Sequence, residues 1–272
     1  MLKKRSLFVA LLVALIVLAV VLVITLHPSK EKVFKIGASP VPHNEILEQV
    51  KDDFRKETGY ELKIIIFTDY VQPNIALEQE DIDANFFQHI PYLESFNLKN
   101  GYTDLISAAK IHVEPMGLYL KKPLNELSPS DTVLLPNDST NEGRALMLLE
   151  NNGIITLRSE NKLIATVKDI SENKYGINFL ELEAPLLPRT FKEDSKIAGA
   201  VINTNYAIEA GLNPISDSTF IEGSDSAYAN IIAVKEKYID SKLLKSLISL
   251  LQSEKIKSFI NSKYNGAVVP VF

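Results

Sequence analysis

The sequence predicts an α/β protein with two domains, each containing a doubly wound, mainly parallel sheet, preceded by an N-terminal transmembrane helix. Three observations support this fold class. Short apolar runs that suit buried strands alternate with amphipathic helical patterns, which favours sheets covered by helices. The 272 residues suffice for two modest domains. A long uncharged apolar run near the N-terminus can span a bilayer.

The N-terminal apolar run predicts a membrane anchor. Lys3, Lys4 and Arg5 precede the uncharged run Leu7–Ile24. The apolar region of a cleaved signal peptide is usually only about 7–15 residues long and is followed by a small-residue cleavage site, which this chain lacks. We therefore expect residues 1–32 to stay as an anchor in the cell membrane, with the remaining chain on the extracytoplasmic side. A cleaved signal peptide is the alternative.

The first expected domain comprises residues 33–121 and 228–272. It opens with strands at Val33–Ala38, Leu62–Phe67 and Asp83–Phe87, separated by amphipathic helical segments. Because a strand, a helix and a second strand in this order form a right-handed parallel unit, the pattern predicts a parallel sheet.

The second expected domain comprises residues 122–227. Ser139 followed by Glu142 indicates a capping box that opens a helix running to Asn151. The segment 164–170 predicts a strand that leads into a helix. Ala198–Ile202 is a further strand and ends at Asn203, where a short helix begins.

The C-terminal part of the sequence returns to the first domain. Asn230–Val234 has the composition of a strand, and Ser241–Tyr264 carries leucines and isoleucines at helical spacing with a break near Ser253. The apolar tail Val268–Phe272 is expected to pack on the first domain.

Aromatic side chains gather where two neighbouring strands end. Tyr70 lies on the loop after the strand Leu62–Phe67, and Phe87 and His89 leave the carboxyl end of the next strand. Ligands of open α/β sheets bind at such ends, so these residues are candidates for a small-molecule pocket. An aromatic core with a structural histidine is an equally good interpretation of the pattern alone.

Two polar residues are further candidates. Arg144 lies in the first turns of a predicted helix, where free amide hydrogens and a guanidinium together suit a carboxylate. A solvated surface arginine is the alternative. Asn203 follows a strand and could face a ligand, or it could cap the helix that begins there.

Composition excludes several functions. A net charge of −5 without a basic cluster beyond the first residues argues against nucleic acid as a partner. The sequence contains no cysteine and none of the common catalytic or phosphate-binding motifs, so an enzyme is the weaker hypothesis. No cofactor is expected, and no metal, because Asp81 and Asp83 make only a weak pair and the histidines are scattered: His27, His43, His89 and His112.

Four segments carry a resemblance to a known family: FTDYVQPN, DANFFQHIPYL, VINTNYAIEAGLNP and YANIIAV. In this order and spacing they resemble the NlpA family of methionine-binding ABC transporter lipoproteins, from about residue 35 to residue 272. The resemblance implies a two-domain periplasmic-binding-protein-like fold of type II. Members of the family are typically lipidated on a cysteine after the signal peptide. This sequence has no cysteine, and the predicted transmembrane helix would replace that anchor.

The resemblance also implies a function and a set of residues. The protein would bind L-methionine in the cleft between the domains and deliver it to an ABC transporter permease and its ATPase. Tyr70, Phe87 and His89 would surround the thioether side chain. The segment PNDSTNEGRAL resembles the part of the family that holds the carboxylate, which implicates Arg144 with Asn141 beside it. The residues that would hold the carboxylate and amino groups are Arg144, Asn203 and Asn230.

The ligand and the class of function have alternatives. D-methionine, a methionine-containing dipeptide or another amino acid could occupy the same cleft, because sequence does not give pocket volume. The same fold also serves some enzymes, and a surface-anchored binding protein could act as an adhesin.

Overall fold

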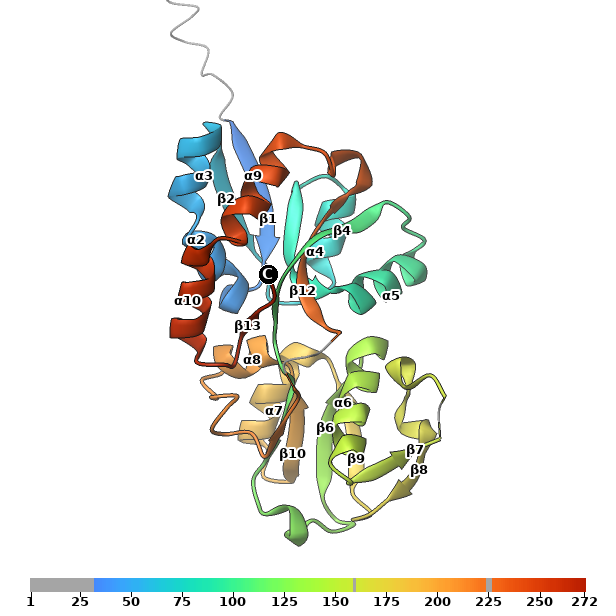
Figure 1. Ribbon diagram of the computed structural model, residues 1–272. Coiled ribbons are helices and arrows are strands. Elements are labelled where there is room, and N and C mark those ends of the chain that lie inside the picture. The colour runs from blue at the N-terminus through green and yellow to red at the C-terminus, as the bar shows by residue number, and fades with distance from the viewer. Residues whose placement is uncertain (1–31, 159, 224–226) are drawn as a thin grey trace, which may run out of the picture. The chain divides into compact units, whose positions relative to one another are not determined.

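The computed structural model describes residues 32–158, 160–223 and 227–272 (Figure 1). Residues Phe34–Phe272 form one compact unit. Within this unit the helices surround two large sheets, and we call each sheet with its helices a lobe (Figure 1).

The sheet of the first lobe has six strands in the order β13-β4-β12-β3-β1-β2. Its strands are β1 (Val33–Ala38), β2 (Glu61–Ile66), β3 (Ala84–His89), β4 (Leu105–Val113), β12 (Ala229–Lys235) and β13 (Val269–Pro270). Its helices are η1 (Pro40–Asn44), α2 (Glu45–Glu48), α3 (Lys51–Thr58), α4 (Gln72–Glu78), α5 (Ile90–Asn100), η6 (Glu236–Tyr238), α9 (Lys242–Leu251) and α10 (Glu254–Tyr264). The predicted break near Ser253 and the docking of the C-terminal tail on this lobe are confirmed.

The sheet of the second lobe has five strands in the order β11-β5-β10-β6-β9. Its strands are β5 (Gly117–Leu120), β6 (Thr132–Pro136), β9 (Asn178–Leu182), β10 (Ile197–Ile202) and β11 (Phe220–Ile221). Its helices are η2 (Leu124–Glu126), α6 (Ser139–Asn151), η3 (Lys162–Ile164), η4 (Val167–Asp169), η5 (Ala184–Leu186), α7 (Leu187–Glu193) and α8 (Thr204–Glu209). A separate pair, β7 (Ile155–Leu157) and β8 (Ile170–Asn173), completes the lobe.

Both sheets are mixed, so the prediction of mainly parallel sheets is wrong. β1 runs parallel to β3, but β12 is antiparallel to both β3 and β4. In the second sheet β6 is parallel to β9 and β10, and β5 is antiparallel to β10. The reason is the path of the chain. β4 leads away from the first lobe and β12 returns to it, so these two strands run in opposite directions (Figure 1).

The core of each lobe lies between its sheet and the surrounding helices. In the first lobe, Phe54 and Leu247 from helices α3 and α9 pack with Ile36 and Phe86 from the sheet. Every residue of β3 and of β10 is buried, as expected for central strands covered on both faces. The buried ends of these strands provide a fixed base for the side chains that follow them.

Two local predictions in the second lobe are wrong. Asp138 is the N-cap of α6, and its Oδ1 accepts a hydrogen bond of 3.0 Å from the backbone N–H of Asn141. Glu142 accepts instead from the backbone N–H of Val167, so the predicted capping box does not form. The segment 164–170 is not a strand that leads into a helix: it contains the last residue of η3, all of η4 and the first residue of β8.

The predicted N-terminal transmembrane helix is also corrected. None of the helices in the described part of the chain is long and apolar enough to cross a membrane. The longest of them, α6, has 13 residues, whereas a span needs about 20. The predicted helix at Leu7–Ile24 lies outside the described residues. Within the described residues the fold class is two α/β lobes, and the cell-membrane location predicted from that helix is withdrawn.

The chain crosses between the sheets earlier than the sequence predicts. β4 ends at Val113 in the first sheet, and β5 begins at Gly117 in the second. The predicted boundary near residue 121 had left β5 with the first domain. We therefore propose that the boundary between the two domains lies at residues 114–116.

Candidate functional site

One cavity between the two sheets collects all seven residues that the sequence nominates. These residues are Tyr70, Phe87, His89, Asn141, Arg144, Asn203 and Asn230. Five further residues line it that the sequence did not nominate: Gln88, Tyr92, Glu114, Thr204 and Asn205. The empty volume is about 330 Å³ including the opening to solvent.

Aromatic rings from the first lobe form one wall of the cavity. The ring centre of Tyr70 lies 5.8 Å from that of Phe87 and 5.7 Å from that of Tyr92. The Tyr92 hydroxyl donates to the main-chain oxygen of Tyr70 at 3.0 Å, and the Tyr70 hydroxyl donates to Oδ1 of Asn205 at 2.6 Å. These contacts fix the rings, so the wall is an ordered apolar surface.

His89 joins the aromatic wall to the polar one. The prediction placed it beyond its strand, but it is the last residue of β3 and the N-cap of α5. Its Nδ1 accepts from the backbone N–H of Tyr92 at 3.1 Å, which places the ring proton on Nε2, 3.3 Å from Oδ1 of Asn141. Burial, and then the charge of Arg144, lower the pKa of His89 to about 3, so the ring is neutral near pH 7.

A chain of amides orients Asn203. The two carboxylate oxygens of Asp138 accept hydrogen bonds of 3.0 and 2.9 Å from Nδ2 of Asn141. Oδ1 of Asn141 then accepts from Nδ2 of Asn203 at 2.9 Å. Oδ1 of Asn203 is buried and has no hydrogen-bond partner among the described residues. Asn203 occupies the N-cap position of α8, but its side chain makes no capping bond. The capping role is therefore excluded, and a buried acceptor remains at the cavity.

Arg144 is buried, with 3% of its side chain exposed, which contradicts the alternative of a solvated arginine. Its Nε donates to Oε1 of Glu222 at 2.9 Å and its Nη2 donates to Oε2 at 2.6 Å. The same Nη2 donates to the main-chain oxygen of Glu114 at 2.7 Å, and the ring of Tyr228 lies 4.4 Å from the guanidinium carbon. Arg144 is thus held by Glu114 in the first chain crossing and by Glu222 and Tyr228, which lie between β11 and β12. Glu222 is also the negative group that stabilises a cation in the first turns of a helix.

Asn205 presents a donor to the cavity. Its Oδ1 accepts from Tyr70, and its buried Nδ2 has no hydrogen-bond partner within residues 32–158, 160–223 and 227–272. The sequence contained a signal for this residue, because it follows Asn203 at the same strand end.

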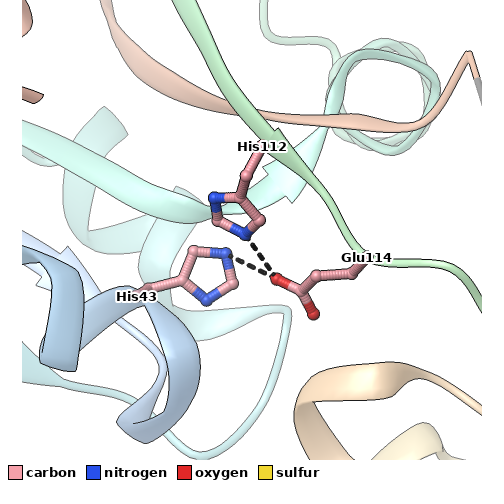
Figure 2. A group of neighbouring side chains, drawn as sticks. All are labelled: His43, His112 and Glu114. Carbon is pink, nitrogen blue, oxygen red and sulfur yellow. Dashed lines mark hydrogen bonds and ion pairs between the residues drawn. The ribbon is translucent and has the colours of Figure 1, made fainter. Parts of the chain in front are cut away.

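A cluster of His43, His112 and Glu114 lies beside the cavity (Figure 2). Oε1 of Glu114 lies 2.8 Å from Nε2 of His112 and 3.2 Å from Nε2 of His43. The sequence interpretation of scattered histidines is therefore wrong for these two, whose ring centres are 5.0 Å apart. β4 supplies His112 and η1 supplies His43, so only the folded chain brings them together (Figure 2).

The cluster contains atoms that could ligate a metal ion, since its three donor atoms lie within 4.8 Å of one another. A ligating histidine, however, almost always donates its second ring N–H to a neighbouring acceptor. Nδ1 of His112 has no such partner in the part of the chain that the structure describes. The arrangement fits a hydrogen-bonded carboxylate better than a metal centre.

Comparison with known proteins gives close relatives. The NlpA lipoprotein family matches residues 34–272. The methionine-binding lipoprotein MetQ of Bacillus subtilis is 42% identical over 247 residues, covering 89% of each chain. A nutrient binding protein from Burkholderia cenocepacia bound to methionine is 39% identical, with a TM-score of 0.83 over 88% of this chain and 100% of that one.

A periplasmic substrate-binding protein of an ABC transporter from Coxiella burnetii is 37% identical, with a TM-score of 0.81 over 88% of this chain and 100% of that one. The two-lobed α/β fold and the order of its segments are shared with these relatives. On the extent of these matches, the chain belongs to the NlpA lipoprotein family.

Proposed function

We propose that this chain is the substrate-binding protein of an ABC importer and that it binds L-methionine in the cavity between the two lobes. The observation that carries the proposal is the division of the cavity into an aromatic wall and a wall with buried polar groups around Arg144. An amino acid with an unbranched apolar side chain matches both walls. The similarity to a relative named as methionine-binding, and to a nutrient binding protein solved with methionine bound, supports the same ligand.

The residue roles follow from the two walls. Tyr70, Phe87 and His89 surround the thioether side chain, because their rings form the ordered apolar surface. Arg144 holds the carboxylate, since a guanidinium is the strongest available partner for it. Asn230 assists Arg144 in binding the ligand. Its Oδ1 is hydrogen-bonded to His43 at 3.0 Å, so its amide nitrogen points to the ligand as a donor in this proposal.

Asn141 acts through another residue. Its side chain is bonded to Asp138, Asn203 and His89, so it positions the polar wall and takes no ligand atom itself. The ligand is released unchanged to the permease and its ATPase, and we propose binding without turnover. Incubation of the protein with L-methionine, followed by NMR of the small molecule, tests this and should show no product.

Calorimetry tests the ligand. The full-length chain is unfolded and refolded to remove any carried ligand, and is then titrated with L-methionine, D-methionine, glycyl-methionine and leucine. The proposal predicts one site per chain and the tightest binding for L-methionine. A preference for D-methionine or for the dipeptide would leave the cavity as the binding site but would replace L-methionine as the proposed ligand. No heat with any of the four ligands would reject the proposed function.

A further inference from the structure

We propose that the Glu114 carboxylate binds the α-ammonium group of the ligand, so that the cavity selects free α-amino acids. The inference rests on the proposed function and adds a recognition element that the sequence did not nominate. It follows from the charges around Glu114, from the proton positions on its two histidines, and from the polar atoms that the cavity leaves without partners.

The Glu114 carboxylate is a buried acid without a cationic partner. Glu114 is 5% exposed and lines the cavity. Its Oε1 faces Nε2 of His43 and Nε2 of His112 (Figure 2). No lysine or arginine nitrogen of the described residues lies within ion-pair distance of this carboxylate. Arg144 instead donates a hydrogen bond to the main-chain oxygen of Glu114 and forms its ion pair with Glu222.

The two histidines donate hydrogen bonds but bring no charge. The Ser39 hydroxyl lies 2.6 Å from Nδ1 of His43, shorter than its 3.2 Å contact with the main-chain oxygen of Val41, so we assign the hydroxyl proton to Nδ1. The ring proton of His43 is then on Nε2, which lies 3.0 Å from Oδ1 of Asn230 and 3.2 Å from Oε1 of Glu114. Burial lowers the pKa of His43 to about 4 and that of His112 to about 3, so both rings are neutral near pH 7.

A buried carboxylate with only neutral donors is costly in free energy unless a cation arrives. Burial raises the pKa of Glu114 even though the charge of nearby Arg144 acts to lower it, because no lysine or arginine of the described residues pairs directly with the carboxylate. An ammonium group in the cavity supplies that counter-ion through a charge-assisted hydrogen bond.

The remaining polar atoms of the cavity match the same ligand. Oδ1 of Asn203 is an unpartnered acceptor, and Nδ2 of Asn205 is an unpartnered donor, among the described residues. Their orientations are set by Asn141 and Tyr70 respectively. Glu114 and Asn203 therefore accept from an ammonium, while Arg144 and Asn205 donate to a carboxylate. This pairing of two acceptors with two donors is the polarity of an α-amino acid zwitterion.

The decisive experiment compares ligands with and without the ammonium group. Wild type and Glu114→Gln, both as full-length chains, are titrated with L-methionine and with its 2-hydroxy analogue, in which a hydroxyl replaces the ammonium. Wild type should prefer L-methionine by roughly 10²–10⁴-fold, because buried polar groups left unpaired reject the analogue. In Glu114→Gln the preference should fall to within about tenfold, through weaker binding of L-methionine.

A second variant and a stability measurement separate recognition from folding. Glu142 is also buried but accepts a hydrogen bond from Val167 and does not line the cavity, so Glu142→Gln should keep the wild-type preference. Ligand-free Glu114→Gln should unfold at or above the wild-type temperature, because an uncompensated acid is removed. If Glu114→Gln kept the wild-type preference for L-methionine over the 2-hydroxy analogue, the ammonium site would be overturned. The proposed function would still stand in that case, provided that wild type binds L-methionine.

Zinc tests the competing occupant of the cluster. Chelator-treated wild type should bind L-methionine as before and should give no stoichiometric heat with Zn²⁺. Binding of one Zn²⁺ that His112→Gln abolishes, with the ligand preference unchanged in Glu114→Gln, would assign the cluster to a metal ion and overturn the ammonium site.

Discussion

The cavity is lined by one buried basic residue, Arg144, and one buried acidic residue, Glu114, and their charged groups have different partners. The Arg144 guanidinium is paired with Glu222 and packs against Tyr228. Among the described residues, the Glu114 carboxyl is contacted by neutral groups, which are the imidazoles of His43 and His112 and the backbone N–H of Asn205. One charge is therefore balanced before a ligand arrives, and the other is not.

The difference separates two tasks of a binding site. A paired arginine keeps its position and its charge in the empty protein, so it is pre-organised for a carboxylate at a low ordering cost. A glutamate without a cation gains a partner only when the ligand enters. Arg144 therefore contributes to fixed geometry, and Glu114 contributes to discrimination between ligands that have an ammonium group and those that lack it.

The largest expected effect concerns the balanced charge. Arg144→Leu removes the carboxylate partner and leaves Glu222 without its cation. Breaking a buried ion pair from one side costs about 3–5 kcal/mol of stability, and we expect L-methionine binding to weaken by at least about 3 kcal/mol, roughly 100-fold. Calorimetry and urea unfolding measure the two losses.

Glu222→Gln is the matched control for that pair. It keeps the guanidinium and most of its hydrogen bonds, so L-methionine affinity should fall by no more than about tenfold. An equal loss in both variants would mean that Arg144 acts only through its position in the ion pair, and the contrast between the balanced and the unbalanced charge would fail.

Acid should destabilise the protein through the buried neutral histidines His43, His89 and His112. Their pKa values are about 4, 3 and 3 in the folded chain and about 6.5 when unfolded. The unfolded chain therefore binds protons first as the pH falls below about 6.5. At pH 5, about 1.5 units lower, each histidine should cost about 2 kcal/mol of unfolding free energy.

Glu114 should act in the opposite direction. Its folded pKa is raised by burial, so protonation relieves a penalty as the pH falls. Urea unfolding from pH 7.5 to pH 5 measures the sum of these effects. His112→Gln should flatten the dependence and Glu114→Gln should steepen it. If neither wild type nor His112→Gln changed in stability over this range, the folded histidines would have to titrate like those of the unfolded chain, which would contradict their lowered pKa values.

The apolar half of the site was predictable from sequence, and the polar half was predictable only in part. β10 is a continuous apolar run, and the aromatic residues near the end of β3 are visible in a single segment. Arg144 was visible because it lies in the first turns of a predicted helix, but its partner Glu222 lies 78 residues later. No local pattern signals such a pair.

The cluster at Glu114 shows the same limit. His43 and Glu114 come from η1 and from the first chain crossing, and they meet only because β1, β3, β12 and β4 are neighbours in that order. The mixed direction of the sheets was missed for a related reason, since apolar runs show that a strand is buried without showing which way its neighbour runs.

Asn230→Ala tests a residue of the cavity lining that contacts the same His43 imidazole as Glu114 does. Oδ1 of Asn230 accepts from His43, so the variant leaves that imidazole N–H with Glu114 alone and removes an amide from the ligand site. We expect a loss of about 1–2 kcal/mol in L-methionine binding. Asn97→Ala, which removes an amide bonded to the main-chain oxygen of Leu105 outside the cavity lining, serves as the control and should bind normally. Wild-type affinity in Asn230→Ala would remove this residue from the site.

Tyr70 offers the smallest and most selective test, because one hydroxyl links the aromatic wall to the polar one. Tyr70→Phe keeps the ring and removes the bond to Asn205, so the Asn205 amide is free to turn. We expect L-methionine to lose about 1 kcal/mol, with its preference over leucine unchanged. Tyr70→Ala should instead relax the preference for methionine over leucine, since it removes the ring that packs against Phe87. If both variants change selectivity alike, the hydroxyl and not the apolar surface defines the side-chain pocket.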